Sequence, residues 1–119
     1  MNSTEQVTAR ILALVPDYAV PLESLRRDWS PDDPSLCMRL AALVWWIVEA
    51  SRNGRTEFGG LSEYLDELLD CTEWDVRDAV LTCYLESLVN RVPEEIPKYK
   101  LDTLLGPKAR QLAESWLNP

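Results

Sequence analysis

The sequence has no histidine, only four glycines and one phenylalanine, and 12 basic residues against 20 acidic ones. The lack of histidine removes the commonest general base and the commonest metal ligand, so no Cys-His or Ser-His catalytic pair is possible. Gly59-Gly60 has the spacing of a turn and not that of a phosphate-binding loop. The carboxylates lack the loop spacing of a calcium site. These absences favour a protein that is not an enzyme and that uses no metal or cofactor.

Net charge and cysteine content limit the partners and the compartment that can be expected for this protein. The formal net charge is −8, so nucleic acid and anionic membranes repel the chain unless its charges are segregated. Residues 40–48 are the longest stretch without charge, well short of the roughly 20 apolar residues that span a bilayer. Met1 to Arg10 is polar, and no signal peptide is expected. Cys37, Cys71 and Cys83 have no Cys-x-x-Cys spacing, which predicts buried thiols in a reducing cytoplasm and neither disulfides nor a zinc site.

The uncharged stretch lies in a predicted central helix over residues 34–52. Asp33 is suited to the N-cap and Pro34 to the first helical position. Apolar residues fall on every side of this helix, which predicts that neighbours bury it all round. Trp45 and Trp46 are then core residues. The alternative is that one of them reaches the surface as a binding anchor.

Apolar periodicity and end signals predict further helices on both sides of the central one. Two short apolar stretches, 88–92 and 98–101, alternate like strands, and a loop with Pro93 and Pro97 separates them. They predict a small antiparallel hairpin that its prolines keep from recruiting more strands. The fold class is therefore mainly α with one hairpin. The predicted further helices are 3–15, 22–29, 61–69, 72–87 and 107–117.

The order of elements from residue 34 resembles the winged-helix superfamily. Leu61–Leu69 and Thr72–Ser87 correspond to its helix-turn-helix. The stretch 87–91 (Ser-Leu-Val-Asn-Arg) is similar to the Gly-Leu-Val-x-Arg entry to the wing, with Ser87 where glycine is usual, and 99–106 resembles the Tyr-x-Leu-Thr-x-x-Gly exit. The resemblance implies an N-terminal helical extension over residues 1–33 and a winged-helix-like domain over 34–119. It also implies that the helix from Thr72 is the one that enters the major groove in DNA-binding relatives.

Charge opposes that use of the helix here. Between Leu61 and Asp78 there are seven acidic residues and one basic residue, Arg77. A DNA reader needs several Lys or Arg contacts to phosphate, and these carboxylates would repel the duplex. The alternative is a transcription regulator that contacts DNA through a basic wing and edge. Its candidate residues are Arg52, Arg55, Arg77, Arg91, Lys98 and Lys100.

A second apolar stripe, formed by Trp74, Leu81 and Leu85, lies away from the predicted core face of the helix from Thr72. The N-terminal helices could cover this stripe, a second copy could pair through it, or a partner chain could bind it. We expect a non-enzymatic acidic interaction module that binds a partner protein with a basic surface. Adaptors, assembly subunits, antitoxin-like regulators and inhibitors, including mimics of DNA charge, fit this description. The acidic rim of the stripe would be Asp66, Asp70, Asp75 and Asp78.

Overall fold

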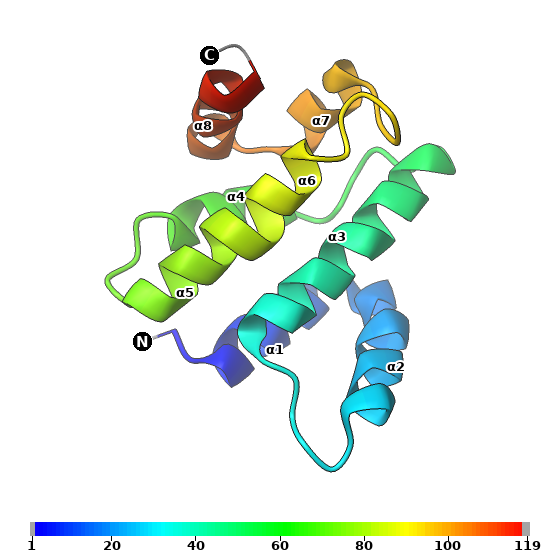
Figure 1. Cartoon of the computed structure of the whole chain (residues 1–119), viewed down its shortest axis with the longest axis vertical. Coiled ribbons are helices and arrows are strands. Elements are labelled where there is room, and N and C mark those ends of the chain that lie inside the picture. Colours follow the sequence, from blue (N-terminus) through cyan, green and yellow to red (C-terminus); the bar gives the residue numbers. More distant parts are fainter. Residues whose placement is uncertain (1, 118–119) are drawn as a thin grey trace.

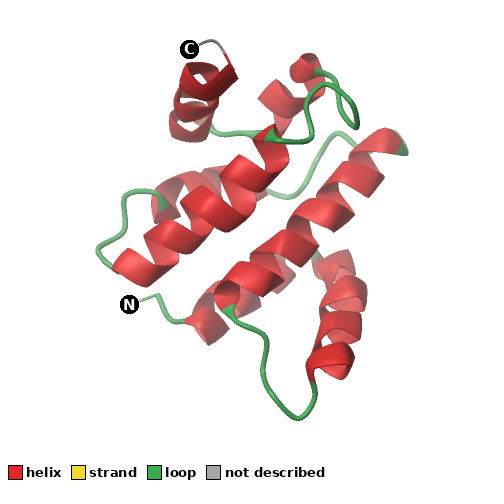
Figure 2. Ribbon diagram, in the orientation of Figure 1, coloured by secondary structure: helices red, strands yellow, loops and turns green. Residues whose placement is uncertain are grey.

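The computed structural model of the chain describes residues 2–117, and every regular element in that range is a helix. Figures 1 and 2 show helices joined by short loops, with no strand. The elements are α1 (Thr4–Leu14), the 3₁₀ helix η1 (Pro16–Tyr18), α2 (Ala19–Trp29), α3 (Leu36–Arg52), α4 (Leu61–Leu68), α5 (Trp74–Ala79), the π-helix η2 (Val80–Glu86), α6 (Ser87–Val89), α7 (Lys98–Leu104) and α8 (Pro107–Leu117).

Two long helices form the centre of the fold. The elements α5, η2 and α6 follow one another without a break over residues 74–89, and we call them together the long helix. Figure 1 shows the long helix beside α3 and running in the same direction, and η2 is the part of it that contacts α3 most extensively. The first two helices, α1 and α2, pack on α3, while α8 packs on α4 and on η2. The core therefore lies between helical layers.

The sequence predicts that neighbours bury the central helix all round, and the structure shows that they do not. It begins after Ser35, whose Oγ accepts a hydrogen bond from the amide of Met38 at 3.2 Å, so Asp33 and Pro34 precede the helix. Neighbouring helices cover two flanks of α3, and a third flank faces solvent. Trp45 lies on that open flank and is 65% exposed, whereas Trp46 is half-buried against the core.

The predicted hairpin is wrong, and with it the winged-helix-like fold. Leu88 and Val89 complete the long helix, and both are buried, which strand alternation would not allow. A series of turns follows, and α7 then starts after Pro97, whose backbone is extended. Leu101 and Leu104 are both buried on α7, which is helical spacing. The alternation over 98–101 was too short to separate a strand from a helix.

Residues before position 33 share the core of the rest of the chain. Val7, Ile11, Tyr18 and Leu22 belong to the same buried cluster as the residues of α3. The buried side chain of Arg39 also ties α1 to α3. Its Nη1 donates to Glu5 Oε1 at 2.9 Å and to Thr8 Oγ1 at 3.0 Å, and its Nε donates to Pro34 O at 2.9 Å. The outer ends of the two predicted domains, residues 1 and 118–119, lie outside the described residues.

The prediction of three free thiols is also wrong. Cys37 on α3 and Cys83 on η2 form a disulfide across the two parallel helices. Cys71 is free and half-buried, and its Sγ donates to the carbonyl oxygen of Glu73 at 3.5 Å. Cys37 and Cys83 are 46 positions apart in the sequence, and no local signal indicates this pairing. Within residues 2–117, no helix combines the length and the apolar character that crossing a bilayer requires.

Candidate functional site

Trp74 is the single aromatic residue among the predicted partner-binding residues, and its side chain is exposed. It is the first residue of α5 and is 74% exposed. The guanidinium of Arg77 lies over its ring, with Cζ 4.4 Å from the ring centroid. Asp75 and Asp78 are exposed beside it, and Asp75 is in the first helical turn, where the helix dipole favours a negative charge. We call Trp74, Asp75 and Asp78 the α5 face.

Two of the predicted rim residues serve the fold instead. The carboxylate of Asp66 caps α8, accepting hydrogen bonds from the backbone amides of Lys108 at 2.9 Å and Ala109 at 2.8 Å. Asp70 is exposed and forms an ion pair with the side chain of Lys108. Asp66 therefore has its oxygens occupied by α8, and the charge of Asp70 is partly neutralised by Lys108.

The predicted apolar stripe is not continuous. Leu85 is fully buried, and Leu81 is half-buried against the core, so Trp74 alone remains as an exposed apolar anchor. The π-helix explains the difference. A π-helical turn contains one residue more than an α-helical turn. The residues that follow it are therefore rotated by about 100° from the positions that a straight α-helix would give them. From η2 into α6 the buried positions recur every four residues, at Val80, Tyr84 and Leu88, and Leu85 turns inward beside them.

The basic residues predicted for DNA contact do not form one patch. Arg77 lies at the start of the long helix, whereas Lys98 and Lys100 belong to α7, at its other end (Figure 1). Arg52 is exposed at the end of α3. The other five are each held by a protein group: Arg55 over Trp46 and Phe58, Arg77 over Trp74, Arg91 over Trp45, Lys98 by Asp102 and Glu114, and Lys100 by the carbonyl of Ser51.

Trp45 borders an apolar groove between α2 and α3 with a volume of about 570 Å³. The guanidinium of Arg91 lies 5.1 Å from the centroid of its ring. The sequence analysis gave Trp45 as a possible surface anchor for a partner. The apolar lining of the groove is Pro21, Leu25, Met38, Ala41, Ala42 and Trp45.

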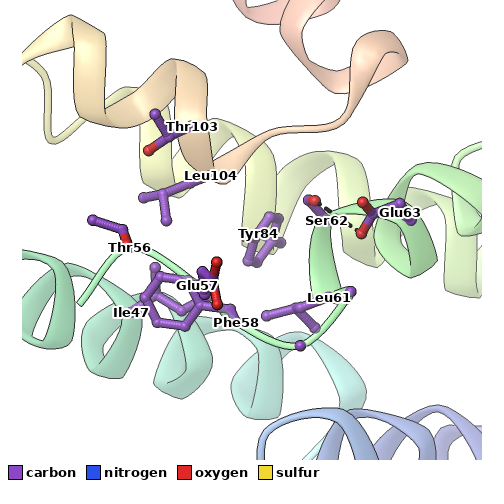
Figure 3. Close-up of a pocket in the computed structure, with 12 residues that line it drawn as sticks. Ile47, Thr56, Glu57, Phe58, Leu61, Ser62, Glu63, Tyr84, Thr103 and Leu104 are labelled. Carbon is purple, nitrogen blue, oxygen red and sulfur yellow. Dashed lines mark hydrogen bonds between the residues drawn. The ribbon is translucent and has the colours of Figure 1, made fainter.

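A smaller hollow, of about 290 Å³, opens between α3, the 56–60 segment, α4, η2 and α7 (Figure 3). Its apolar lining includes Ile47, Phe58, Leu61, Leu104 and the ring of Tyr84. Its polar lining is Thr56, Glu57, Gly59, Gly60, Ser62, Glu63 and Thr103. Sequence reasoning missed this site, because its residues come from four separate parts of the chain. We call it the Tyr84 hollow.

Known proteins give no direct guide to these surfaces. No protein-family model, curated protein or solved structure matches the chain. In residues 2–117, no group of three or more Cys, Asp or Glu side chains is placed to hold a metal ion.

Proposed function

We propose that this protein is a non-enzymatic interaction module that binds a basic surface of a partner protein through the α5 face. The observation that supports this most is the exposure of Trp74, 74% of whose surface is open to solvent beside two exposed carboxylates. Tryptophan is enriched among the residues that carry most of the energy of protein interfaces. Carboxylates around such an anchor steer the approach of a basic partner and select against acidic ones.

The α5 face is also pre-organised for binding. The Arg77 guanidinium over the Trp74 ring restricts the rotation of an otherwise exposed side chain. Less conformational entropy is then lost when a partner covers the ring. Asp75 and Asp78 form no ion pair within residues 2–117, so their charges are available to a partner without breaking an existing contact.

DNA binding by the same chain has less support. Duplex DNA would meet the carboxylates of α5 rather than a positive surface, and Arg77 lies at the opposite end of the long helix from Lys98 and Lys100. A partner that itself binds nucleic acid is a special case of the proposal, because the α5 carboxylates would then occupy a groove that normally holds phosphates. Duplex DNA should compete with this protein for such a partner.

A charge-reversal experiment with a matched control tests the proposal. Asp75→Lys/Asp78→Lys reverses the α5 face, and Asp32→Lys/Asp33→Lys makes the same change in net charge in the exposed loop before α3. Both variants should fold, because surface substitutions usually change stability by less than about 0.5 kcal/mol. Each protein is used to capture partners from its host cells, and the captured partner is then purified and titrated.

The expected result is specific to the α5 face. The partner should bind the wild type and the Asp32→Lys/Asp33→Lys variant alike, and the α5 variant at least tenfold more weakly. The loss should come mainly from slower association and should shrink as salt is raised, because screening weakens exposed charges. Equal affinity of the two variants would show that the α5 carboxylates are only a solvated surface.

A further inference from the structure

The groove between α2 and α3 is lined by one face of each helix. Both faces have the i, i+3, i+4, i+7 spacing of a helix side that packs on other helices. Figure 1 shows the two helices running in opposite directions on either side of their connecting loop. One end of the groove therefore lies next to the loop and the other end away from it. The lining residues are Pro21, Ser24, Leu25 and Asp28 from α2, and Met38, Ala41, Ala42 and Trp45 from α3.

The helix α2 has little packing of its own within the described chain. Leu22 is its one buried residue, and no side chain caps its N-terminus. Val20 and Trp29 are 77% and 46% exposed. Figure 1 shows α2 at the edge of the molecule, across α3 from the long helix. A helix of 11 residues is marginal in water without a packed face, so a helix that covers the groove would stabilise α2.

The groove is self-complementary in shape. Ala41 and Ala42 lie at its middle and leave room for another helix to approach closely, Trp45 lies at the end away from the loop, and Met38 and Leu25 lie nearer the loop. A two-fold axis through the middle brings the Trp45 ring of each copy to the Met38 end of the other. Contact between an aromatic ring and a thioether sulfur is favourable. The four helices then surround one shared core, as in a four-helix bundle.

Polar groups and charge fit the same pairing. Asp28 lines the groove near the loop, is exposed and forms no ion pair within residues 2–117. The two-fold axis places the Trp45 indole of the other copy beside it, where the indole N–H can donate to the carboxylate. Residues 19–52 contain five acidic and four basic side chains, so they carry only −1 of the net charge of −8. This side of the molecule therefore repels its own copy less than the rest of the surface does.

We propose that this protein forms a two-fold symmetric homodimer in which the α2–α3 groove of one copy binds the same groove of the other. Trp45 is the anchor. Arg91 holds the Trp45 ring from outside the groove, with Cζ 5.1 Å from the ring centroid. The groove shares no residue with the α5 face, so the dimer carries two α5 faces. A contact formed by one side of two short helices is small, and we expect a dissociation constant in the micromolar range.

Sedimentation velocity of the full chain tests the dimer, from about 1 µM to about 1 mM. The monomer should predominate at the lowest concentration, where the unfolding of single chains is measured, and the dimer at the highest. Added salt should tighten the dimer, because it screens the repulsion between two chains of charge −8. The complex of the α5 face with a basic partner should respond to salt in the opposite direction. A monomer at every concentration, or association that salt weakens, would overturn the proposal.

Variants with matched controls test the contact. Trp45→Ala should weaken the dimer at least tenfold, and Trp45→Phe and Asp28→Ala about threefold each, since both remove the same hydrogen bond. The double variant Trp45→Phe/Asp28→Ala should then be no weaker than either single one. Trp74→Ala and Asp75→Ala remove the same side chains from the α5 face and should dimerise as the wild type does. If Trp74→Ala dissociates the dimer and Trp45→Ala does not, the α5 face is the interface and the proposal fails.

Hydrogen exchange locates the interface on the chain. The backbone amides of α2 should exchange more slowly at the concentration of the dimer than at that of the monomer, because α2 gains a packed face. The amides of α8 should exchange equally at both concentrations, and Trp45→Ala should remove the difference in α2. Dimerisation without protection of α2 would overturn the proposal. A chain that stays monomeric, and whose captured partner is lost in Trp45→Ala, would show that the groove holds another protein instead of a second copy.

Discussion

The guanidinium of Arg77 lies over the indole ring of Trp74, with Cζ 4.4 Å from the ring centroid. The two residues are three positions apart and so lie on neighbouring turns of the same helix face. A cation–π contact at an exposed site contributes about 0.5–1 kcal/mol. Its effect here is to hold in place a large aromatic side chain that makes little contact with the core. Arg91 and Trp45 repeat the arrangement at the other end of the long helix.

The two adjacent tryptophans of α3 should differ in their contribution to stability. Trp46 packs on the core and meets the ring of Phe58 edge-on at 5.7 Å, whereas Trp45 is 65% exposed. Trp46→Ala should lower the free energy of unfolding by about 2 kcal/mol, roughly half the cost at a fully buried site. Trp45→Ala should cost less than about 1 kcal/mol. Urea denaturation of each variant measures both, and equal losses would contradict the placement of the two rings.

Asp66 and Gly106 should be energetically coupled. Loss of the cap in Asp66→Ala should cost about 1–2 kcal/mol, since the amides of Lys108 and Ala109 lose their acceptor. Gly106→Ala should also destabilise the protein, because its Cβ would lie 2.6 Å from Asp66 Cγ. In the double variant the carboxylate is absent, so the second cost should largely vanish. A double-mutant cycle from urea denaturation tests this, and additive losses would show that the two residues are independent.

Reduction of the Cys37–Cys83 disulfide should destabilise the protein. The bond spans 46 residues, and freeing a loop of that size costs about 2–4 kcal/mol, chiefly through the unfolded chain. Cys37→Ser/Cys83→Ser should reproduce the effect of a reducing agent. Cys71→Ser is the control, since Cys71 is outside the bond. If a reducing agent lowers the stability of the double variant as much as that of the wild type, the bond is not the cause.

Alkaline pH should destabilise the protein through its buried tyrosines. Burial raises the pKa of Tyr84 and of Tyr18 above the usual value in the folded state. The pKa of each tyrosine is therefore higher in the folded protein than in the unfolded chain. Burial of the neutral tyrosines contributes fully to the stability of the fold below the unfolded pKa of about 10, and this contribution is lost as pH rises above it. Tyr84→Phe should remove part of this decline. Free energies of unfolding at pH 9 and pH 11 measure it, and the same decline in both proteins would show that Tyr84 is not the buried group responsible.

Helices with strong local signals were predictable from the sequence. The predicted 3–15, 61–69 and 107–117 agree with α1, α4 and α8 to within a residue or two, because apolar periodicity and end signals coincide there. The start of α3 was harder. The sequence predicted Asp33 as the N-cap and Pro34 as the first helical residue, whereas the hydrogen bond from the Met38 amide to Ser35 Oγ shows that Ser35 is the N-cap.

The features that sequence reasoning missed depend on contacts between distant residues. Lys98–Leu101 alternates as a strand would, and its helical state depends on the burial of Leu104 together with Leu101. Leu85 falls on an outward stripe of an ideal α-helix, and the π-helix turns it into the core. The Cys37–Cys83 pairing and the Tyr84 hollow likewise join segments that are far apart in the chain. The acidic character of α5, in contrast, follows directly from composition.

The most direct test of the α5 face is the dissociation constant of the captured partner for Trp74→Ala, compared with that for Trp45→Ala. The two substitutions remove the same side chain from two exposed sites, each of which has an arginine over the ring. If Trp74 is the anchor, Trp74→Ala should weaken the complex by about 2 kcal/mol or more, roughly 30-fold, and Trp45→Ala should leave it unchanged. Unchanged affinity for Trp74→Ala would contradict the assignment, and a loss confined to Trp45→Ala would move the interface to the groove between α2 and α3.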